Sequence, residues 1–189
     1  MTKIPVKIVE FSDGGKKIQE VMIDLVDTMQ IDGDPGKKIE QFRDKYFDLV
    51  KQTQNIMPKE KSKRKPSHFW QIGKLLYDFN NSIKNDFEIR NYDQSIMRDF
   101  KYFKSPRTIA YIIELGKFFK KNEILDSTPI TLYFELLQKR NTMQSLGLFG
   151  KEKERLVKLA KQKKLPGKMK YREELKKALN QSQKISIGK

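Results

Sequence analysis

The sequence predicts a mostly helical protein, all-α with room for one short N-terminal strand. Apolar residues recur at spacings of three and four over most of the 189-residue chain, which is the spacing of an amphipathic helix. Several of these segments also open with a helix-capping side chain followed by proline, as at Ser105-Pro106. Together the two patterns predict a multi-helix domain.

The N-terminal residues carry more than one pattern. Residues 3–11 alternate well enough for one strand, and Ser12-Asp13-Gly14-Gly15 marks a turn after them. A β-hairpin is one interpretation of this strand and turn. However, the apolar residues from Ile18 to Met29 fall on one helical face, so we predict a helix over about 15–29.

Helices are predicted in order through the rest of the chain. The expected ranges are about 34–56, 67–84, 92–103, 105–121, 128–141, 151–164 and 169–180, with a frayed tail behind the last. The expected N-caps are Asp34, Ser67, Ser105 and Thr128.

The net charge of +16 is unevenly distributed. Residues 1–57 hold nine Lys/Arg and ten Asp/Glu, residues 58–143 hold 17 and 10, and residues 144–189 hold 14 and 4. We therefore predict a neutral N-terminal unit (1–57), a basic linker (58–66), a helical domain (67–143) and a basic helical pair with a tail (144–189). Concentrated positive charge repels itself, so a polyanion is the expected partner.

Composition also argues against several classes of function. The chain has no Cys and a single His, which excludes disulfides, thiolate metal sites and a zinc site built from several histidines. No Walker-type phosphate loop or Ser-His-Asp set is recognisable, and acid pairs such as Asp24/Asp27 lie in the least basic segment. We expect a non-enzymatic protein with no cofactor and no metal.

Location follows from the lack of long apolar runs. No apolar segment approaches 18 residues, and the segment after Met1 lacks the apolar core of a signal peptide. We therefore expect no membrane partner and a cytoplasmic or nucleoid location.

Residues 92–121 form a predicted helix-turn-helix unit. In such units the N-terminal residues of the second helix face base edges in the major groove. Arg107, Thr108 and Tyr111 are therefore the candidates for reading DNA bases. An ordinary helical hairpin in an all-α core is the competing interpretation.

Phosphate contacts are expected mainly from lysine, which outnumbers arginine 32 to 8. The linker is interpreted either as an arm that tracks a phosphate backbone or as a plain soluble linker. The C-terminal pair is interpreted as a phosphate-contacting surface, a second reading unit or a solvated hairpin. The phosphate candidates are Lys63, Arg64, Lys65, Lys101, Lys104, Lys158, Lys161, Lys168, Lys170, Arg172 and Lys176.

Three segments resemble a known helical domain. They are Phe69-Trp-Gln-Ile-Gly-Lys-Leu-Leu, Ser105-Pro-Arg-Thr-Ile-Ala-Tyr-Ile and Thr131-Leu-Tyr-Phe-Glu-Leu-Leu. In this order they resemble the helical N-terminal domain of prokaryotic proteins that carry a PD-(D/E)XK nuclease-like domain behind it. Nothing after Ser145 shows the strand-borne acidic pattern of the nuclease-like domain, so we expect that domain to be absent. The resemblance then implies a DNA-associated helical module without cleavage chemistry.

The leading hypothesis is a non-enzymatic, prokaryotic DNA-binding protein, a transcription regulator or a nucleoid organiser. The neutral unit 1–57 is expected to form a homodimer or dock a partner, because two-fold DNA readers need such an element; alternatively it simply packs on the core. The rival hypotheses are an RNA- or ribosome-associated basic protein and a protein–protein adaptor.

Overall fold

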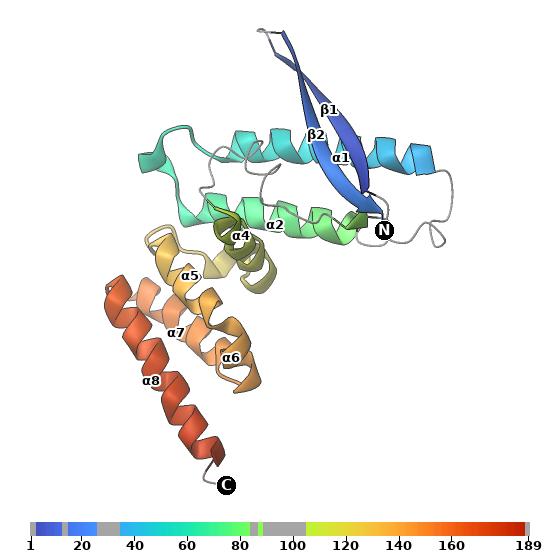
Figure 1. Cartoon of the computed structure of the whole chain (residues 1–189). Helices are drawn as coiled ribbons and strands as arrows, with labels where there is room; N and C mark the ends of the chain where they lie inside the picture. Colours follow the sequence, from blue (N-terminus) through green and yellow to red (C-terminus); the bar gives the residue numbers. More distant parts are fainter. Residues whose placement is uncertain (1–2, 13–14, 26–34, 84–86, 89–104, 188–189) are drawn as a thin grey trace.

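The computed structural model describes residues 3–12, 15–25, 35–83, 87–88 and 105–187. This part of the chain is mostly helical, as predicted (Figure 1). In chain order the elements are β1 (Lys3–Ser12), β2 (Gly15–Leu25), α1 (Pro35–Ile56), the 3-10 helix η2 (Lys61–Lys63), α2 (Pro66–Ile83), β3 (Phe87–Glu88), α4 (Pro106–Phe118), the 3-10 helix η3 (Lys121–Glu123), α5 (Ile130–Gln138), α6 (Arg140–Ser145), α7 (Phe149–Lys161) and α8 (Lys168–Ile187).

The N-terminal segment is a β-hairpin, so the predicted helix over 15–29 is wrong. β1 pairs with β2 in antiparallel register from Lys3↔Asp24 to Ser12↔Gly15, and β3 adds a short third strand beside β2. The apolar residues of β2 fit helical spacing, but three of them, Val21, Ile23 and Leu25, also alternate. Residues 15–25 form a strand and not a helix because β1 pairs with them from Gly15 to Asp24.

Helix α1 packs beside α2 and runs antiparallel to it (Figure 1). Phe42, Tyr46 and Phe79 form an aromatic cluster between the two helices, with ring centroids 5.7–6.1 Å apart. The predicted inward face of α1 is confirmed at Phe42, Tyr46, Leu49 and Thr53, which are all buried. The helix of the neutral unit therefore packs on the core.

Two glycines let α2 and α4 cross in near-contact. A Cβ at Gly73 would collide with the carbonyl oxygen of Ile112, and one at Gly116 would collide with the backbone of Gly73 and Lys74. Only hydrogen at both positions permits this approach. The crossing brings Ile112 and Leu115 of α4, both fully buried, against α2.

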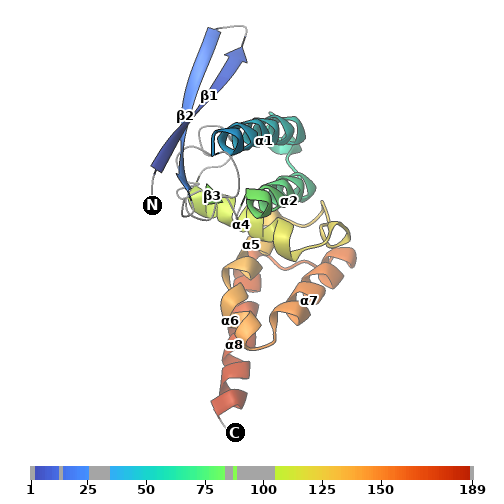
Figure 2. The same ribbon diagram turned by 90° about the vertical axis from the view of Figure 1, so that its right-hand side faces the viewer.

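The C-terminal helices share a second part of the core. Leu132, Leu136, Leu156, Tyr171 and Leu175 of α5, α7 and α8 are each no more than 1% exposed. Figure 2 shows α6, α7 and α8 below α2 and α4. Helix α8 continues to Ile187, so the expected end near 180 is wrong.

The predicted caps have different outcomes. Ser105 caps α4 as expected, because its Oγ accepts from the backbone N of Thr108 at 3.3 Å. Ser67 is no cap: α2 already begins at Pro66, and the backbone N of Ser67 donates to Asp126 Oδ1, 59 residues away. Thr128 does not cap either, since α5 begins after Pro129 without a side-chain cap. Asp34 and the predicted helix 92–103 lie outside the described residues.

Candidate nucleic-acid interface

The connector between α1 and α2, residues 57–65, is a folded turn. Arg64 closes it: Nε donates to the carbonyl oxygen of Pro58 at 3.1 Å and Nη2 to that of Lys59 at 3.2 Å. Lys63 pairs with Glu60 at 2.9 Å, three residues back. This linker, interpreted from the sequence as either an arm or a plain linker, is a hydrogen-bonded turn in which Arg64 has a structural role, while Lys59, Lys61 and Lys65 are exposed.

The segment after α4 lies against the first turn of α2, next to this connector. Asp126 joins the two through its hydrogen bond from the backbone N of Ser67, 3.0 Å long. Burial pushes the pKa of Asp126 upward, but the hydrogen bonds from Ser67 and the positive charge of Lys65 outweigh it and leave the pKa below its usual range. The contact brings Lys120 and Lys121, both exposed, to the same side as the connector.

The end of α7 completes this side of the molecule. A hollow of about 460 Å³ is lined by Asn122 and Glu123 of η3 and by Lys158 and Lys161 of α7, among others. Lys153 holds the two elements together through its ion pair with Glu123 at 3.0 Å. Figures 1 and 2 both place the connector, the segment after α4 and the end of α7 along one side of the molecule.

The turn after α7 puts a lysine where helices usually place glycine. The backbone N–H of Lys163 bonds to the carbonyl of Ala160, and that of Lys164 to the carbonyl of Leu159, which is the hydrogen-bond pattern of a Schellman cap. Lys163 takes the left-handed position of this cap, with φ of 56°. A side chain costs about 1 kcal/mol there relative to glycine, so the turn gives up stability and gains a charge.

We call this side the basic end. It is defined by nine exposed lysines from three separate segments: Lys59, Lys61, Lys65, Lys120, Lys121, Lys158, Lys161, Lys163 and Lys164. No ion pair joins any of the nine to another described residue. Of the acids nearby, Glu60, Glu123 and Asp126 are already engaged, and Glu154 is exposed.

The candidate base-reading residues sit at the other end of α4. Arg107 is exposed, and its Nε donates to the hydroxyl of Tyr111 at 2.8 Å. Tyr111 also packs on Phe134, and the Thr108 hydroxyl shares a 2.9 Å hydrogen bond with Ser105. The thirteen residues of α4 span about 20 Å at 1.5 Å per residue. Arg107 therefore lies about that far from Lys120 and the basic end.

The candidates on α8 divide into two groups. Arg172 forms two hydrogen bonds to the buried Glu135, at 2.8 and 2.6 Å, and Lys168 approaches the same carboxylate at 3.6 Å. The Arg172 bonds hold the pKa of Glu135 below its usual range although the carboxyl is buried. These two cations dock α8 onto α5, while Lys170 and Lys176 are exposed.

Two of the predicted phosphate-contacting lysines, Lys101 and Lys104, lie outside the described residues. No three His, Cys, Asp or Glu side chains gather closely enough to hold a metal ion in the described part of the chain. Nor is any helix among those residues long and apolar enough to cross a membrane.

Comparison of the chain with protein-family models, curated proteins and solved structures found no match. The resemblance to the helical domain of nuclease-like proteins stays a prediction, and function has to be inferred from the chain's own surface.

Six lysines of the basic end were not among the candidates: Lys59 and Lys61 of the linker, Lys120, Lys121, Lys163 and Lys164. Lys120 and Lys121 come after a run of core aromatics, and Lys163 and Lys164 lie in a turn that the sequence assigned to a helix. The charge run 161–164 was the available signal for the second pair.

Proposed function

We propose that this chain is a non-enzymatic DNA-binding protein that contacts phosphates mainly through lysine. The observation that carries the proposal is the basic end. Nine lysines from three segments, up to about 100 residues apart in sequence, gather there, and no ion pair joins any of them to a described acid. Exposed like charges repel one another unless a polyanion or salt compensates them, and the phosphate backbone of DNA supplies that charge at short, regular spacing.

Lys163 adds independent support. A residue in the left-handed region is costly unless it is glycine or asparagine, and strained backbone positions gather at functional sites. Lysine at this cap position is poorly chosen for stability alone, and a role in binding phosphate accounts for it.

The surface favours backbone contact over base readout. Lysine is a point charge that suits phosphate, whereas bidentate recognition of guanine suits arginine. Arg64, Arg140, Arg155 and Arg172 donate to backbone carbonyl or carboxylate oxygens of the protein, whereas Arg107 donates to the hydroxyl of Tyr111. Arg107 remains the candidate for base reading, and a role for α4 in the major groove is a separate proposal. A regulator and a nucleoid organiser both fit phosphate-led binding.

Salt-dependent binding tests the proposal. The affinity for duplex DNA should fall linearly with salt on logarithmic axes, with a slope of about 0.9 per phosphate contact. The triple variant Lys158→Gln, Lys161→Gln and Lys164→Gln should flatten the slope by up to about 0.9 for each lysine in phosphate contact. A matched variant, Lys37→Gln, Lys45→Gln and Lys151→Gln, removes the same charge from exposed positions outside the basic end.

The two variants separate the outcomes. The proposal requires a clear loss of slope in the first variant and little change in the second. Equal losses in both would show that net charge alone attracts DNA and would remove the basic end as the interface. Tighter binding to structured RNA than to duplex DNA at every salt concentration would replace DNA by RNA as the partner.

A further inference from the structure

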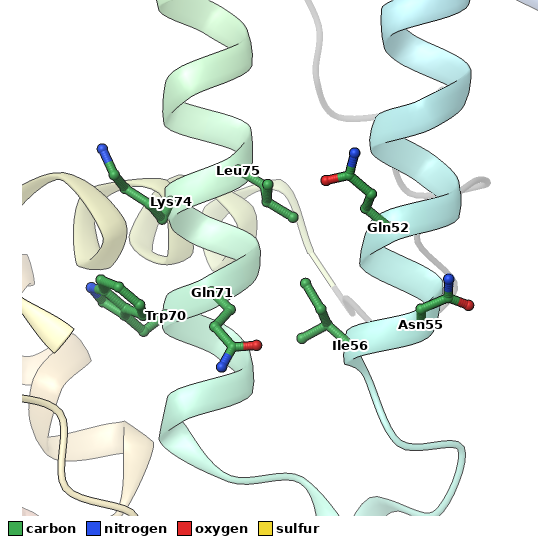
Figure 3. Close-up of a pocket in the computed structure, with 7 residues that line it drawn as sticks. All are labelled: Gln52, Asn55, Ile56, Trp70, Gln71, Lys74 and Leu75. Atoms are coloured by element: carbon green, nitrogen blue, oxygen red, sulfur yellow. The ribbon is translucent and has the colours of Figure 1, made fainter.

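A groove of about 390 Å³ runs across the first half of α2, with the last two turns of α1 on one side and Trp70 and Lys74 on the other (Figure 3). Its size falls in the range of about 300–1,000 Å³ that is usual for small-molecule sites. Apolar side chains and carboxamides share the lining: Ile56, Trp70, Leu75, Gln52, Asn55 and Gln71. The groove is open to solvent along one side.

Trp70 is a fixed wall of this groove. Its indole Nε1 donates to the carbonyl oxygen of Phe119 at 2.8 Å, which sets the orientation of the ring. The ring is half-buried. An aromatic ring that is held in place and partly exposed can stack on a flat partner without first losing rotamer freedom.

The groove itself carries no uncompensated charge. Lys74 at its edge pairs with Asp78 at 2.7 Å, and its ammonium also lies 5.4 Å from the centre of the Tyr77 ring. The carboxamides are neutral, and each offers both donors and acceptors. A neutral, flat, hydrogen-bonding group therefore suits the groove better than an ion.

Positively charged lysines without an ion-pair partner among the described residues lie about one helical turn from the groove, in the connector. The connector, drawn at the foot of Figure 3, joins the two helices directly below the groove. Ile56 precedes Lys59 by three residues, and Gln71 comes five residues after Pro66, about 7.5 Å of helix rise. A neutral groove thus lies next to the exposed Lys59 and Lys65 of the basic end.

We propose that the groove accepts an unpaired nucleobase, stacked on Trp70, while the neighbouring phosphates of the same DNA strand contact the connector lysines. This arrangement matches the chemistry of a nucleotide, whose neutral planar base lies beside an anionic phosphate. Base–aromatic stacking next to a basic track is a common mode of single-strand recognition. The inference rests on the proposed function and narrows its ligand to DNA that has an unpaired base.

The experiment uses strands that differ only in their bases. An oligothymidylate and an abasic strand of equal length carry the same phosphates, so the connector should bind both. The oligothymidylate should bind roughly tenfold more tightly, as expected for a stacked base. It should also quench the fluorescence of Trp70, which is the single tryptophan of the chain, and the abasic strand should not.

Two variants assign the difference to the groove. Trp70→Leu keeps an apolar side chain and should reduce the tenfold preference to near unity. Phe47→Leu removes an aromatic ring that is 41% exposed on α1 outside the groove, and should leave the preference intact. If Trp70→Leu does not fold, Asn55→Ala takes its place. Asn55 is an exposed residue of the groove lining, and its replacement should lower the preference for the oligothymidylate.

Failure of the base-groove proposal can be distinguished from failure of the DNA-binding proposal. Equal binding of the two strands, with unchanged fluorescence and intact duplex binding, would overturn the base groove and leave the DNA-binding proposal standing. If neither strand nor duplex DNA binds, both proposals fail together.

Discussion

Replacing Gly73 or Gly116 by alanine should strongly destabilise the protein. A Cβ at Gly73 would lie 2.8 Å from the carbonyl carbon of Ile112 and closer still to its oxygen; one at Gly116 would lie 2.6 Å from the oxygen of Gly73. Ordinary contacts between such atoms are about 3.5 Å or more. The colliding atoms are backbone, so no rotamer change relieves them, and α2 and α4 would have to move apart.

The cost can be estimated from opposing terms. Overpacking in a core costs about 1–3 kcal/mol, and more where backbone must shift. Alanine returns up to about 1 kcal/mol through its higher helix propensity. Because the collision is with backbone, we expect a net loss of about 3 kcal/mol, which lowers Tm by about 2–4 °C for each kcal/mol in a chain of this size.

Thermal and urea unfolding of the single variants check this expectation. Gly150→Ala is the matched control, because Gly150 lies in the first turn of α7 and a Cβ there meets nothing within 4 Å. Its stability should be unchanged or raised by up to about 1 kcal/mol. The double variant should lose less free energy of unfolding than the two single variants together, because one separation of α2 and α4 relieves both collisions. Wild-type stability in Gly73→Ala would refute the crossing.

Three further predictions concern the basic end and the C-terminal helices. Lys163→Gly should raise the free energy of unfolding by about 1 kcal/mol and weaken DNA binding; urea unfolding and a binding titration would expose either part as wrong. Tyr171→Phe should be neutral or stabilising by up to about 1 kcal/mol, because the hydroxyl is fully buried without a hydrogen-bond partner among the described residues; a clear loss in urea would contradict this. Arg172→Gln should lower Tm at neutral pH. The difference from wild type should shrink as the pH falls below 4.5 and through the depressed pKa of Glu135, because the protonated carboxyl no longer needs the guanidinium; a constant difference in a pH series of melts would refute the pairing.

The helices were predictable where the local pattern agreed with the tertiary contacts. The face of α1 at Phe42, Tyr46 and Leu49 and the cap at Ser105 follow from spacing and side-chain chemistry within one segment. The hairpin was not predictable in this way, because β2 satisfies both periodicities and its pairing with β1 is a contact between segments. Ser67 shows the same limit, since its acceptor, Asp126, is 59 residues distant.

The sequence could predict the type of partner of the candidate site, but not which residues form the site. The charge distribution indicated a polyanion partner and named Lys65, Lys158 and Lys161. It could not reveal that Arg172 is occupied by Glu135, or that the segment after α4 carries Lys120 to the same end as the connector. Burial and pairing of charges depend on the packing of α5 against α8, which residue spacing alone does not specify.

Lysine protection in the DNA complex would test the central claim most directly. The protein is acetylated with and without duplex DNA under mild conditions, and the modified lysines are identified by mass spectrometry. The basic end predicts protection of its nine lysines, with Lys37, Lys45 and Lys151 as reactive in the complex as in the free protein. Uniform protection across the chain, or protection concentrated on Lys37, Lys45 and Lys151, would contradict it.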